Sequence, residues 1–564
     1  MGRAGCNGDA SGAAGARNAS GPRSRSVAGM PGAPPRPMAE RPFDRRAIRW
    51  LAVLALVALA AALRLSALEL RPPHHDEGVN GWFVEKIRRD GHYTYDPGNY
   101  HGPSYFYLLT ASREVLGFGL WQLRLPGALI GAALCLTPLL LRRRMGWGPA
   151  LAAGALLATS PTLVYYARYA IHETLLVGLG LLVAACMLRW ADRGGGGWLI
   201  GGAAALAGMI ATKETTILFL AVSGAWLLGE IVVESWRARR FTVLGRPGGW
   251  SWRASAVALA MVGVMAAIHV ALFTGFLQQP GALGDQLARS FEAYFLWQET
   301  GTGHSGHEKD GCYYLHLGAR YELVLYALAA VGLVAGFRQR WVRGPGLVGF
   351  GLCAAYSCVA YKMPWLPMSW LVLLALPAAH GLSLLARALR DEVAARCGLG
   401  HAVGLALVPA LVITARSSFL RPADEREHLA YVHTHPDYWS WFGLIEAGAA
   451  RVGRQRLVVA VEHDATWPLP WSLHPYPRTR WSASGDEDVI LAASSRVAAV
   501  EERLRRDYLW REVRVRGSAE PARLYLRRGL YARVLGDRVA RDRYTLVPAR
   551  AAGVQLAAGA AASR

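Results

Sequence analysis

The stretch RPPHHDEGVN, residues 71–80, comes shortly after the apolar stretch AIRWLAVLALVALAAALRLSAL, residues 47–68. A helix that crosses a bilayer needs about 20 predominantly apolar residues, so residues 47–68 predict a membrane span. Ionisable side chains close to the hydrocarbon boundary are costly and usually face a cavity or a charged partner. The adjacent carboxylates Asp76 and Glu77 are therefore the first candidates for a functional site.

Ten further apolar segments predict additional spans, which makes about eleven transmembrane helices in total. They lie at residues 121–141, 148–167, 172–190, 198–212, 215–234, 254–276, 316–337, 344–361, 365–386 and 401–419. Arginine clusters such as those at 142–144 and 237–240 recur in every second connecting loop, as expected for cytoplasmic loops. The formal net charge of +22 is therefore explained by arginines that set the membrane topology, and no nucleic-acid partner is expected.

This topology places the arginine-poor loops and everything after about residue 420 outside the cytoplasm. The loops on that side are residues 69–120, 168–173, 212–215, 277–315 and 361–367. A multi-pass protein of the inner membrane is predicted, with its functional site and its C-terminal domain on the extracytoplasmic face.

Composition divides the chain into successive regions. Residues 1–44 are rich in Gly, Ala, Ser and Arg and predict a disordered tail, or sequence upstream of a true start at Met38. The membrane domain is expected over 45–419, with 69–120 as its first external loop. A soluble α/β domain is expected over 420–548, followed by a disordered tail over 549–564.

Two of these regions carry patterns of secondary structure. The apolar spacing in GVNGWFVEKIRRDG, residues 78–91, predicts a helix lying flat on the membrane, with Glu85 on the polar face and Gly91 at its end. In the C-terminal domain, LVVAVEH (457–463), DVILAASS (488–495) and RLYLRR (523–528) predict strands, and residues 495–509 predict a helix.

Ionisable residues gather at the outer ends of the predicted spans. They come from four separate loops and are Asp76, Glu77, Arg168, His172, Glu173, Lys213, Glu214 and Lys362. A carboxylate can deprotonate an acceptor hydroxyl, and Lys or Arg can neutralise a phosphate leaving group. Neighbouring carboxylates also raise one another's proton affinity, which suits one of them as a base. This combination indicates transfer from a lipid-phosphate-linked donor.

Simpler readings of the same residues stay open. The acid pair can cap a helix N-terminus, and Lys213 with Glu214 can form an interfacial ion pair. The histidines at 74, 75, 304, 307 and 316 are candidate ligands of a divalent metal. Histidines in loops more often lie on the surface and contact water, so no metal or other cofactor is expected. The aromatic residues that suit stacking on a sugar also populate membrane interfaces by default; they are Trp82, Tyr93, Tyr105 and Trp365.

Several motifs together resemble a known family. They are HHDEGVNGWF (74–83), YTYDPGNYHGP (93–103), LVYYARYAIHE (163–173), ATKET (211–215), YKMPWLP (361–367) and WPLPW (467–471). As a set, they resemble the GT-C membrane glycosyltransferases, in the branch of protein O-mannosyltransferases (glycosyltransferase family 39-like) and the lipid A aminoarabinose transferase. The nearest subgroup is prokaryotic and labelled flippase-activity-associated. The resemblance covers about residues 45–475.

The resemblance implies the GT-C fold, a polyprenyl-phosphate-sugar donor and roles for three residues. Asp76 matches the first-loop acid taken as catalytic base, and Lys213 matches the position associated with the donor phosphate. Glu173 matches an acid that follows an aromatic-Arg stretch, although this chain has Ile171-His172-Glu173 where the subgroup more often has an Arg-Asn-Asp-like run.

We therefore expect an α-helical polytopic membrane protein of the GT-C type with a C-terminal extracytoplasmic α/β domain. The expected activity is that of an inverting hexosyltransferase, which moves a sugar from the lipid-linked donor to a lipid, glycan or protein acceptor. The expected catalytic residues are Asp76, Glu77 and Glu173. Lys213, Arg168 and Lys362 are expected to bind the donor phosphate, and Trp82, Tyr93, Tyr105, Glu214 and Trp365 the substrate.

The alternative is a non-catalytic component that binds or moves lipid-linked glycans. Such a protein needs polar residues along a path through the membrane. Inside the predicted spans the main candidates are His269 and His380. Since the ionisable residues gather at one edge instead, the sequence favours the enzyme.

Overall fold

The structure is a computed structural model that describes residues 45–99, 101–249, 251–278, 280–303, 306–392, 398–517, 519–536 and 544–549. The tails predicted at 1–44 and 549–564 lie outside these residues, apart from Ala549.

Within the described residues, seven helical segments are long and apolar enough to cross a membrane. They are α1 (Arg45–Leu65), the segment Leu120–Met145 that begins with α4 (Leu120–Leu134), α8 (Glu173–Arg193), α10 (Thr216–Ala238), α11 (Trp252–Phe273), α16 (Met368–Glu392) and the segment Val403–Leu420 that contains most of α17 (Gly398–Ala415). Two bent pairs raise the number to nine if each is one span: α6 (Trp147–Thr159) with α7 (Pro161–Ala167), bent by 60°, and α13 (Tyr313–Tyr321) with α14 (Leu323–Ala335), bent by 103°.

All eleven predicted spans coincide with helices, and two of them fall outside these nine. One is α9 (Gly196–Ile210), which is apolar but has only 15 residues. The other is α15 (Arg340–Cys358), which has two arginines, Arg340 and Arg343, in its first turn. Length and composition thus single out seven to nine crossings among the eleven predicted helices.

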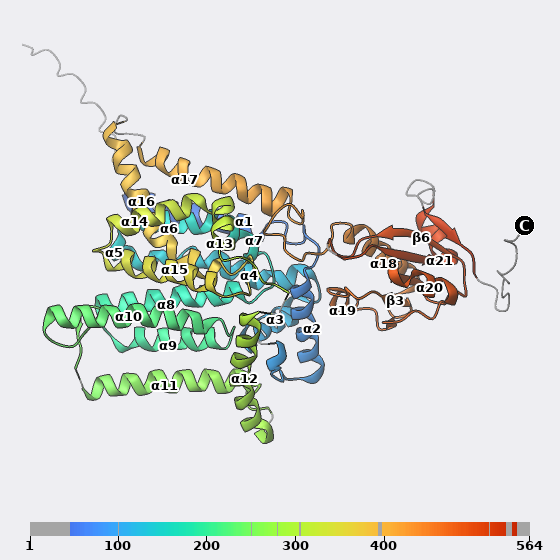
Figure 1. Ribbon diagram of the computed structural model, residues 1–564, viewed down its shortest axis with the longest axis horizontal. Coiled ribbons are helices and arrows are strands. Elements are labelled where there is room, and N and C mark those ends of the chain that lie inside the picture. The colour runs from blue at the N-terminus through green and yellow to red at the C-terminus, as the bar shows by residue number, and fades with distance from the viewer. Residues whose placement is uncertain are drawn as a thin grey trace, which may run out of the picture. The chain divides into compact units, whose positions relative to one another are not determined.

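The helix α16 lies at the centre of the membrane domain. It packs against α6, α8, α14, α15 and α17 (Figure 1). Its residues Met368–Leu376 are buried almost without exception, because the run is apolar on every side of the helix. In contrast, α11 contacts α9 but exposes most of its apolar surface, as expected for a helix that faces lipid.

The first external loop contains α2 (His75–Asp90), η1 (Pro97–Asn99) and α3 (Pro103–Leu116). The predicted helix is confirmed, and Gly91 ends it with a left-handed φ of 77°. The predicted exposed position of Glu85 is wrong. Because α2 packs against α3 and against α19 (Leu469–Ser472), Glu85 is buried and forms ion pairs with Arg88 and Arg113.

Shorter elements join the remaining spans. The hairpin of β1 (Thr242–Val243) and β2 (Arg246–Pro247) follows α10, and the amphipathic α12 (Leu283–Thr302) follows α11 and η3 (Pro280–Ala282). The connections η2 (Thr137–Leu141), α5 (Arg142–Met145) and η4 (Arg416–Leu420) complete the membrane domain.

The C-terminal domain is built on a six-stranded mixed sheet with the order β4-β3-β5-β7-β6-β8. The strands are β3 (Val459–Glu462), β4 (Thr479–Arg480), β5 (Val489–Ala493), β6 (Tyr508–Val513), β7 (Ala522–Arg527) and β8 (Thr545–Val547). β5 is buried on both faces: Val489 and Leu491 pack in one core with α18 (Tyr438–Val452) and α21 (Arg528–Leu535), while Ile490 packs in the other with α20 (Val497–Arg503). The predicted α/β domain is confirmed.

The predicted helix over 495–509 is wrong in its second half. A short turn, η5 (Ser494–Arg496), leads into α20, which stops at Arg503, and Tyr508 and Leu509 belong to strand β6. Both side chains are buried, and their backbone pairs with β7 on one side and β8 on the other. Sheet pairing therefore outweighs the local helical preference of this arginine-rich stretch.

Candidate active site

A polar cavity of about 440 Å³ lies where the predicted outer loops meet. It is lined by the start of α2, the loop before α3, the start of α8, the 212–214 turn, residues from the 307 and 361–365 segments, and the C-terminal domain. The lining residues are His74, His75, Asp76, Val79, Asn80, Gly98, Asn99, His101, Ile171, His172, Glu173, Lys213, His307, Tyr361, Met363, Trp365, Tyr431, Val432 and Arg516. Of the predicted site residues, Asp76, Glu173, Lys213 and Trp365 meet here.

Asp76 stands in the first turn of α2 and is partly exposed to the cavity. His74 caps the helix: its Nδ1 accepts the backbone N–H of Asp76 at 3.1 Å. The Asp76 carboxylate itself has no hydrogen-bond or salt-bridge partner within the described chain. A carboxylate that faces a cavity without a protein partner is available to accept a proton from a substrate.

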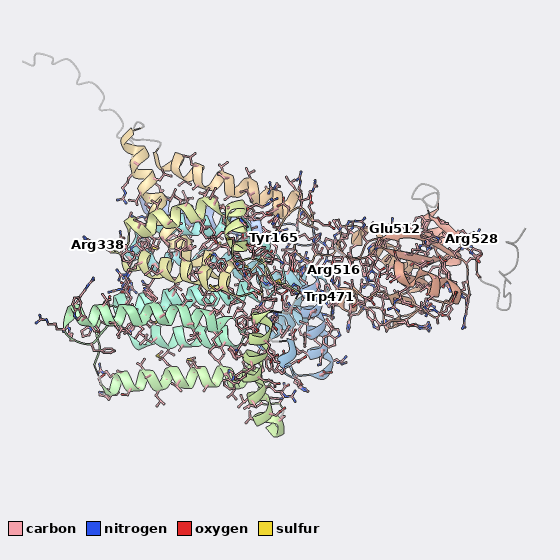
Figure 2. All side chains as sticks on the ribbon, in the orientation of Figure 1. Tyr165, Arg338, Trp471, Glu512, Arg516 and Arg528 are labelled. Carbon is pink, nitrogen blue, oxygen red and sulfur yellow. The ribbon has the colours of Figure 1, made fainter. Side chains whose placement is uncertain are left out.

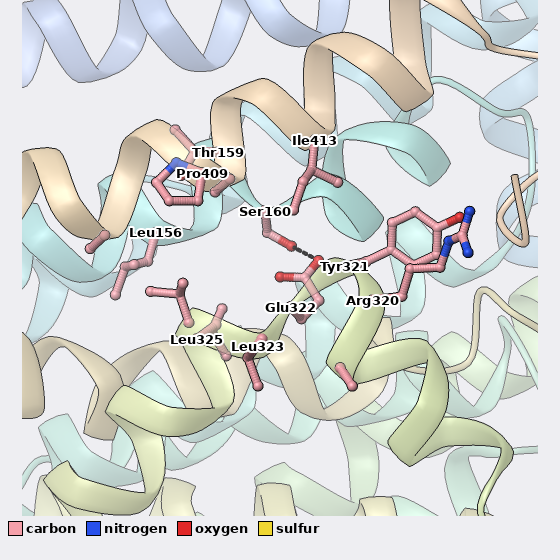
Figure 3. A pocket seen from close by; sticks show the side chains of 14 residues that line it. Leu156, Thr159, Ser160, Arg320, Tyr321, Glu322, Leu323, Leu325, Pro409 and Ile413 are labelled. Carbon is pink, nitrogen blue, oxygen red and sulfur yellow. Dashed lines mark hydrogen bonds between the residues drawn. The ribbon is translucent and has the colours of Figure 1, made fainter.

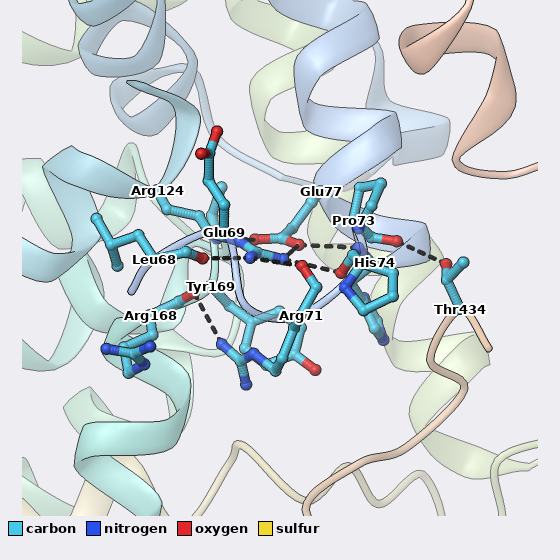
Figure 4. A network of polar contacts seen from close by, with 12 residues as sticks. Leu68, Glu69, Arg71, Pro73, His74, Glu77, Arg124, Arg168, Tyr169 and Thr434 are labelled. Carbon is cyan, nitrogen blue, oxygen red and sulfur yellow. Dashed lines mark hydrogen bonds and ion pairs between the residues drawn. The ribbon is translucent and has the colours of Figure 1, made fainter. Parts of the chain in front are cut away.

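Glu77 has the opposite environment, although it is the next residue. Its side chain is fully buried and binds Arg124 through two hydrogen bonds of 2.6 and 2.7 Å (Figure 4). It also accepts the backbone N–H groups of His74 and Ala170. Burial alone would raise the pKa of Glu77, but the charge and hydrogen bonds of Arg124 outweigh it and hold the pKa below its ordinary value.

The same network fixes the chain that leads into α2. Arg124 also donates to the carbonyl groups of Leu68, Arg71 and Pro72 (Figure 4). The predicted phosphate ligand Arg168 is buried nearby and donates to the carbonyl groups of Ser66 and Ala67, so it does not line the cavity. These two arginines therefore hold the turn between α1 and α2.

Glu173 and Lys213 form an ion pair on the cavity wall. Glu173 is the first residue of α8, and Lys213 lies in the turn after α9, where its backbone forms an isolated bridge to His101. Both side chains are almost completely buried. Lys213 therefore does not form the ion pair with Glu214 that the sequence left open as an alternative. The Glu214 carboxylate instead accepts Tyr95 Oη at 3.5 Å and lies 3.9 Å from His101.

The histidine doublet positions α2. Because Arg516 can only donate, its 2.8 Å contact with Nδ1 of His75 makes that nitrogen an acceptor. Burial and the nearby Arg516 lower the pKa of His75 to about 4, although Asp76 opposes the shift, so the ring is neutral at physiological pH. His74 likewise uses Nδ1 as an acceptor, and its Nε2 donates to the carbonyl of Tyr431 at 2.9 Å. Both rings are thus engaged within the protein.

The remaining predicted residues lie outside the cavity lining. Lys362 donates to the carbonyl of Lys309 at 3.1 Å and is buried there. Tyr93 and Tyr105 are buried in two separate apolar clusters, and Trp82 packs beside Phe83 with about a third of its surface exposed. Trp365 does line the cavity, with its ring edge-on to those of His74 and Tyr166.

No three His, Cys, Asp or Glu side chains of the described residues converge as metal ligands. His307 donates to or accepts from Tyr431 Oη at 2.8 Å, and His304 lies outside the described residues.

A second, mostly apolar cavity of about 180 Å³ lies where the two bent helix pairs meet (Figure 3). At its wall, Glu322 stands in the break between α13 and α14 and accepts Ser160 Oγ at 2.7 Å and the backbone N–H of Thr162 at 2.9 Å. The carboxylate therefore caps α7 and joins the two bends. Sequence reasoning missed this residue, which sits inside an apolar segment.

Comparison with known proteins supports the architecture. Residues 100–262 match the family model described as dolichyl-phosphate-mannose-protein mannosyltransferase. No curated protein matches the sequence. The structure is similar to ArnT from Cupriavidus metallidurans bound to undecaprenyl phosphate, with a TM-score of 0.55 and 15% identity over 84% of this chain and 97% of that chain.

It is also similar to the archaeal oligosaccharyltransferase AglB from Archaeoglobus fulgidus in complex with an inhibitory peptide and a dolichol-phosphate. Here the TM-score is 0.52, with 11% identity over 83% of this chain and 73% of that chain. At such identities the likeness establishes the fold. The chain is therefore a multi-pass membrane protein with the predicted GT-C-like architecture.

Proposed function

We propose that this chain is a GT-C membrane glycosyltransferase, which transfers a sugar from a polyprenyl-phosphate-linked donor to a lipid, glycan or protein acceptor. The observation that carries the proposal is the cavity in which an unpartnered carboxylate, Asp76, shares one lining with the Glu173–Lys213 ion pair. The family model over 100–262 and the fold of ArnT support the same reaction class.

In the proposed reaction, Asp76 is the general base. The acceptor oxygen attacks the anomeric carbon of the donor sugar while Asp76 takes the hydroxyl proton. The bond between the anomeric carbon and the phosphate oxygen breaks, and polyprenyl phosphate leaves with the electron pair. A single displacement of this kind inverts the configuration at the anomeric carbon.

Lys213 is proposed to bind the donor phosphate. Its ammonium group is held on the cavity wall by Glu173, so it is positioned before the substrate arrives. Negative charge develops on the phosphate oxygens as the sugar departs, and a preorganised cation stabilises that charge. Glu173 thus acts as the positioning residue of Lys213.

We propose that three of the predicted site residues hold the surrounding structure in place instead of contacting the substrate. They are Glu77, Arg168 and Lys362. The four hydrogen bonds that Glu77 accepts fix the first turn of α2 and therefore the direction in which Asp76 points. We further propose that Trp365 supplies the aromatic surface for a sugar ring, because it is the predicted aromatic residue that lines the cavity.

We also propose that the reaction needs no divalent metal, since Lys213 supplies positive charge on the cavity wall. Transfer should continue in excess EDTA. Loss of activity in EDTA, restored by Mg²⁺ or Mn²⁺, would refute this part of the proposal.

The cavity is proposed to open on the extracytoplasmic face of the inner membrane, where the arginine-poor loops lie. Cys312 is exposed and follows α12 in one of these loops. In a variant that retains Cys312 as its single cysteine, a membrane-impermeant maleimide should label the protein in intact spheroplasts. Labelling only after lysis would place the cavity on the opposite face.

The central experiment measures release of polyprenyl phosphate by purified protein in lipid, with polyprenyl-phosphate sugars and a membrane-glycan extract. Asp76→Asn keeps the size of the side chain and removes the base, so the rate should fall by about 10²- to 10⁴-fold. Release at the wild-type rate by the Asn variant would exclude Asp76 as the base. If wild-type protein binds lipid-linked glycan but releases no carrier with any sugar, a non-catalytic role in moving such glycans replaces the enzyme.

A further inference from the structure

The C-terminal domain contributes a guanidinium group to the cavity. Arg516 follows strand β6, lines the cavity, and donates through Nη2 to Nδ1 of His75 at 2.8 Å and to the carbonyl of Trp467 at 3.2 Å. Figure 2 labels Arg516 and Trp471, both on the side of the domain that contacts α2. Arg516 belongs to none of the sequence motifs described above and lies 440 positions after Asp76 in the sequence.

This guanidinium has hydrogen-bonding capacity left over. Its Nε is buried and has no hydrogen-bond partner, and no carboxylate of the described chain forms a salt bridge with it. The other cation of the lining, Lys213, already has a carboxylate partner in Glu173. Within the described lining, Arg516 is therefore the cation without a carboxylate partner.

Arg516 lies at the Asp76 end of the cavity. Its guanidinium contacts His75, the residue before Asp76, and all three residues belong to the lining. Lys213 belongs to a different group of neighbours, with Glu173, His101 and His172. If Lys213 holds the donor phosphate, Arg516 stands on the side from which the acceptor hydroxyl reaches Asp76.

The position of Arg516 is fixed by close packing between the C-terminal domain and α2. Gly78 and Gly81 bring the helix so near to the 467–471 segment that an added Cβ would lie 2.6 Å from Pro468 Cα and 2.5 Å from the ring of Trp471. Thr434 Oγ1 also donates to the carbonyl of Pro73 at 2.6 Å. The guanidinium is therefore held in place by the fold.

We propose that Arg516 binds an anionic group, a phosphate or a carboxylate, on the acceptor and thereby places the acceptor hydroxyl beside Asp76. This inference rests on the proposed glycosyltransferase function. A guanidinium presents its N–H groups in a planar fork that matches both anions, and hydrogen bonds between charged groups are the strong ones. The C-terminal domain is then part of the acceptor site.

The test uses full-length protein in lipid, a radiolabelled polyprenyl-phosphate sugar, and membrane glycans separated by anion exchange into neutral and anionic fractions. Wild type should label the anionic fraction. Arg516→Gln should raise the KM for that fraction by about 10- to 100-fold and leave the KM for the donor within about twofold. Arg516→Lys should recover part of the loss, because it restores the charge without the fork.

Arg514→Gln is the matched control, since Arg514 lies two positions away, is exposed, and loses the same charge. Its KM values should equal those of wild type. The unfolding midpoint of each variant, measured in the same lipid, shows that the fold is intact. Hydrofluoric acid removes phosphate esters from the anionic fraction and carbodiimide–borohydride treatment reduces carboxylates; the treatment that abolishes labelling identifies the anion.

Four results would overturn the inference. Equal labelling of the neutral fraction, or an unchanged KM in Arg516→Gln, shows that Arg516 binds no acceptor anion. A raised KM for the donor instead assigns Arg516 to the donor phosphate. If wild type labels neither fraction, the proposed function itself fails and the acceptor assignment falls with it.

Discussion

Asp76 and Glu77 are adjacent acids, but their environments predict that replacing each by its amide has a very different effect on stability. In the wild type the Glu77 carboxylate accepts four hydrogen bonds, from Arg124 Nε at 2.7 Å, Arg124 Nη2 at 2.6 Å, His74 N at 2.8 Å and Ala170 N at 2.9 Å. In Glu77→Gln an NH₂ group replaces one oxygen and points its hydrogens at other donors, while Arg124 becomes a buried, unpaired charge. Breaking a buried ion pair in this way costs about 3–5 kcal/mol.

That free energy corresponds to an increase of about 10²- to 10⁴-fold in the unfolding equilibrium constant. Asp76→Asn makes the same chemical change one residue earlier, at a carboxylate without a protein partner. Its effect on the free energy of unfolding should stay within about 0.5 kcal/mol. The pair of variants thus separates a residue that holds the structure of the site from the residue proposed as the base.

The assay is reversible unfolding in mixed micelles of increasing denaturing-detergent content, followed by tryptophan fluorescence. Glu77→Gln should unfold at a clearly lower detergent fraction than wild type, and Asp76→Asn at the same fraction. Wild-type stability of Glu77→Gln would refute the structural role of the ion pair. A comparable loss in Asp76→Asn would show that Asp76 has a stabilising partner and is not free to act as a base.

Three further predictions concern the docking of the C-terminal domain, the cavity and the ion pairs of Glu85. In Gly81→Ala the new Cβ would overlap the ring of Trp471, so the rate of sugar transfer should fall at least about tenfold and the free energy of unfolding by about 1–3 kcal/mol. Gly148→Ala is the control and should behave as wild type, because an added Cβ at this helical position meets open space. Lys213→Gln should lower kcat/KM for the donor by about 10²- to 10³-fold in steady-state kinetics, and an unchanged value would remove this residue from the phosphate site. Burial alone would raise the pKa of Glu85, but hydrogen bonds from basic side chains outweigh it and lower the pKa from 4.5 to about 2. The stabilising contribution of Glu85 is therefore complete above pH 4.5 and is lost as the pH falls towards 2. The unfolding midpoint of Glu85→Gln should depend less on pH over this range than that of wild type.

The sequence by itself determined the helical membrane architecture and indicated where the candidate site lies. Apolar runs of about 20 residues can satisfy their backbone groups in lipid only as helices, so all eleven predicted segments are helical. Charged residues at the ends of such runs are costly, and this is why Asp76, Glu173 and Lys213 could be identified as members of one site. The continuous apolar run of 489–493 likewise predicted a strand, and the structure shows this strand buried on both faces.

Only the tertiary structure decided which of these ionisable residues face the cavity. Asp76 and Glu77 are neighbouring acids that the sequence does not distinguish. In the structure Arg124 pairs with Glu77 and leaves Asp76 free to face the cavity. Arg516 could not be connected with Asp76 from the sequence, because the contact depends on how the C-terminal domain docks on α2. The physical reason is that hydrophobic periodicity depends on residues that are neighbours along the chain. Ion pairing and close packing depend instead on distances in space, which are set only when the chain folds.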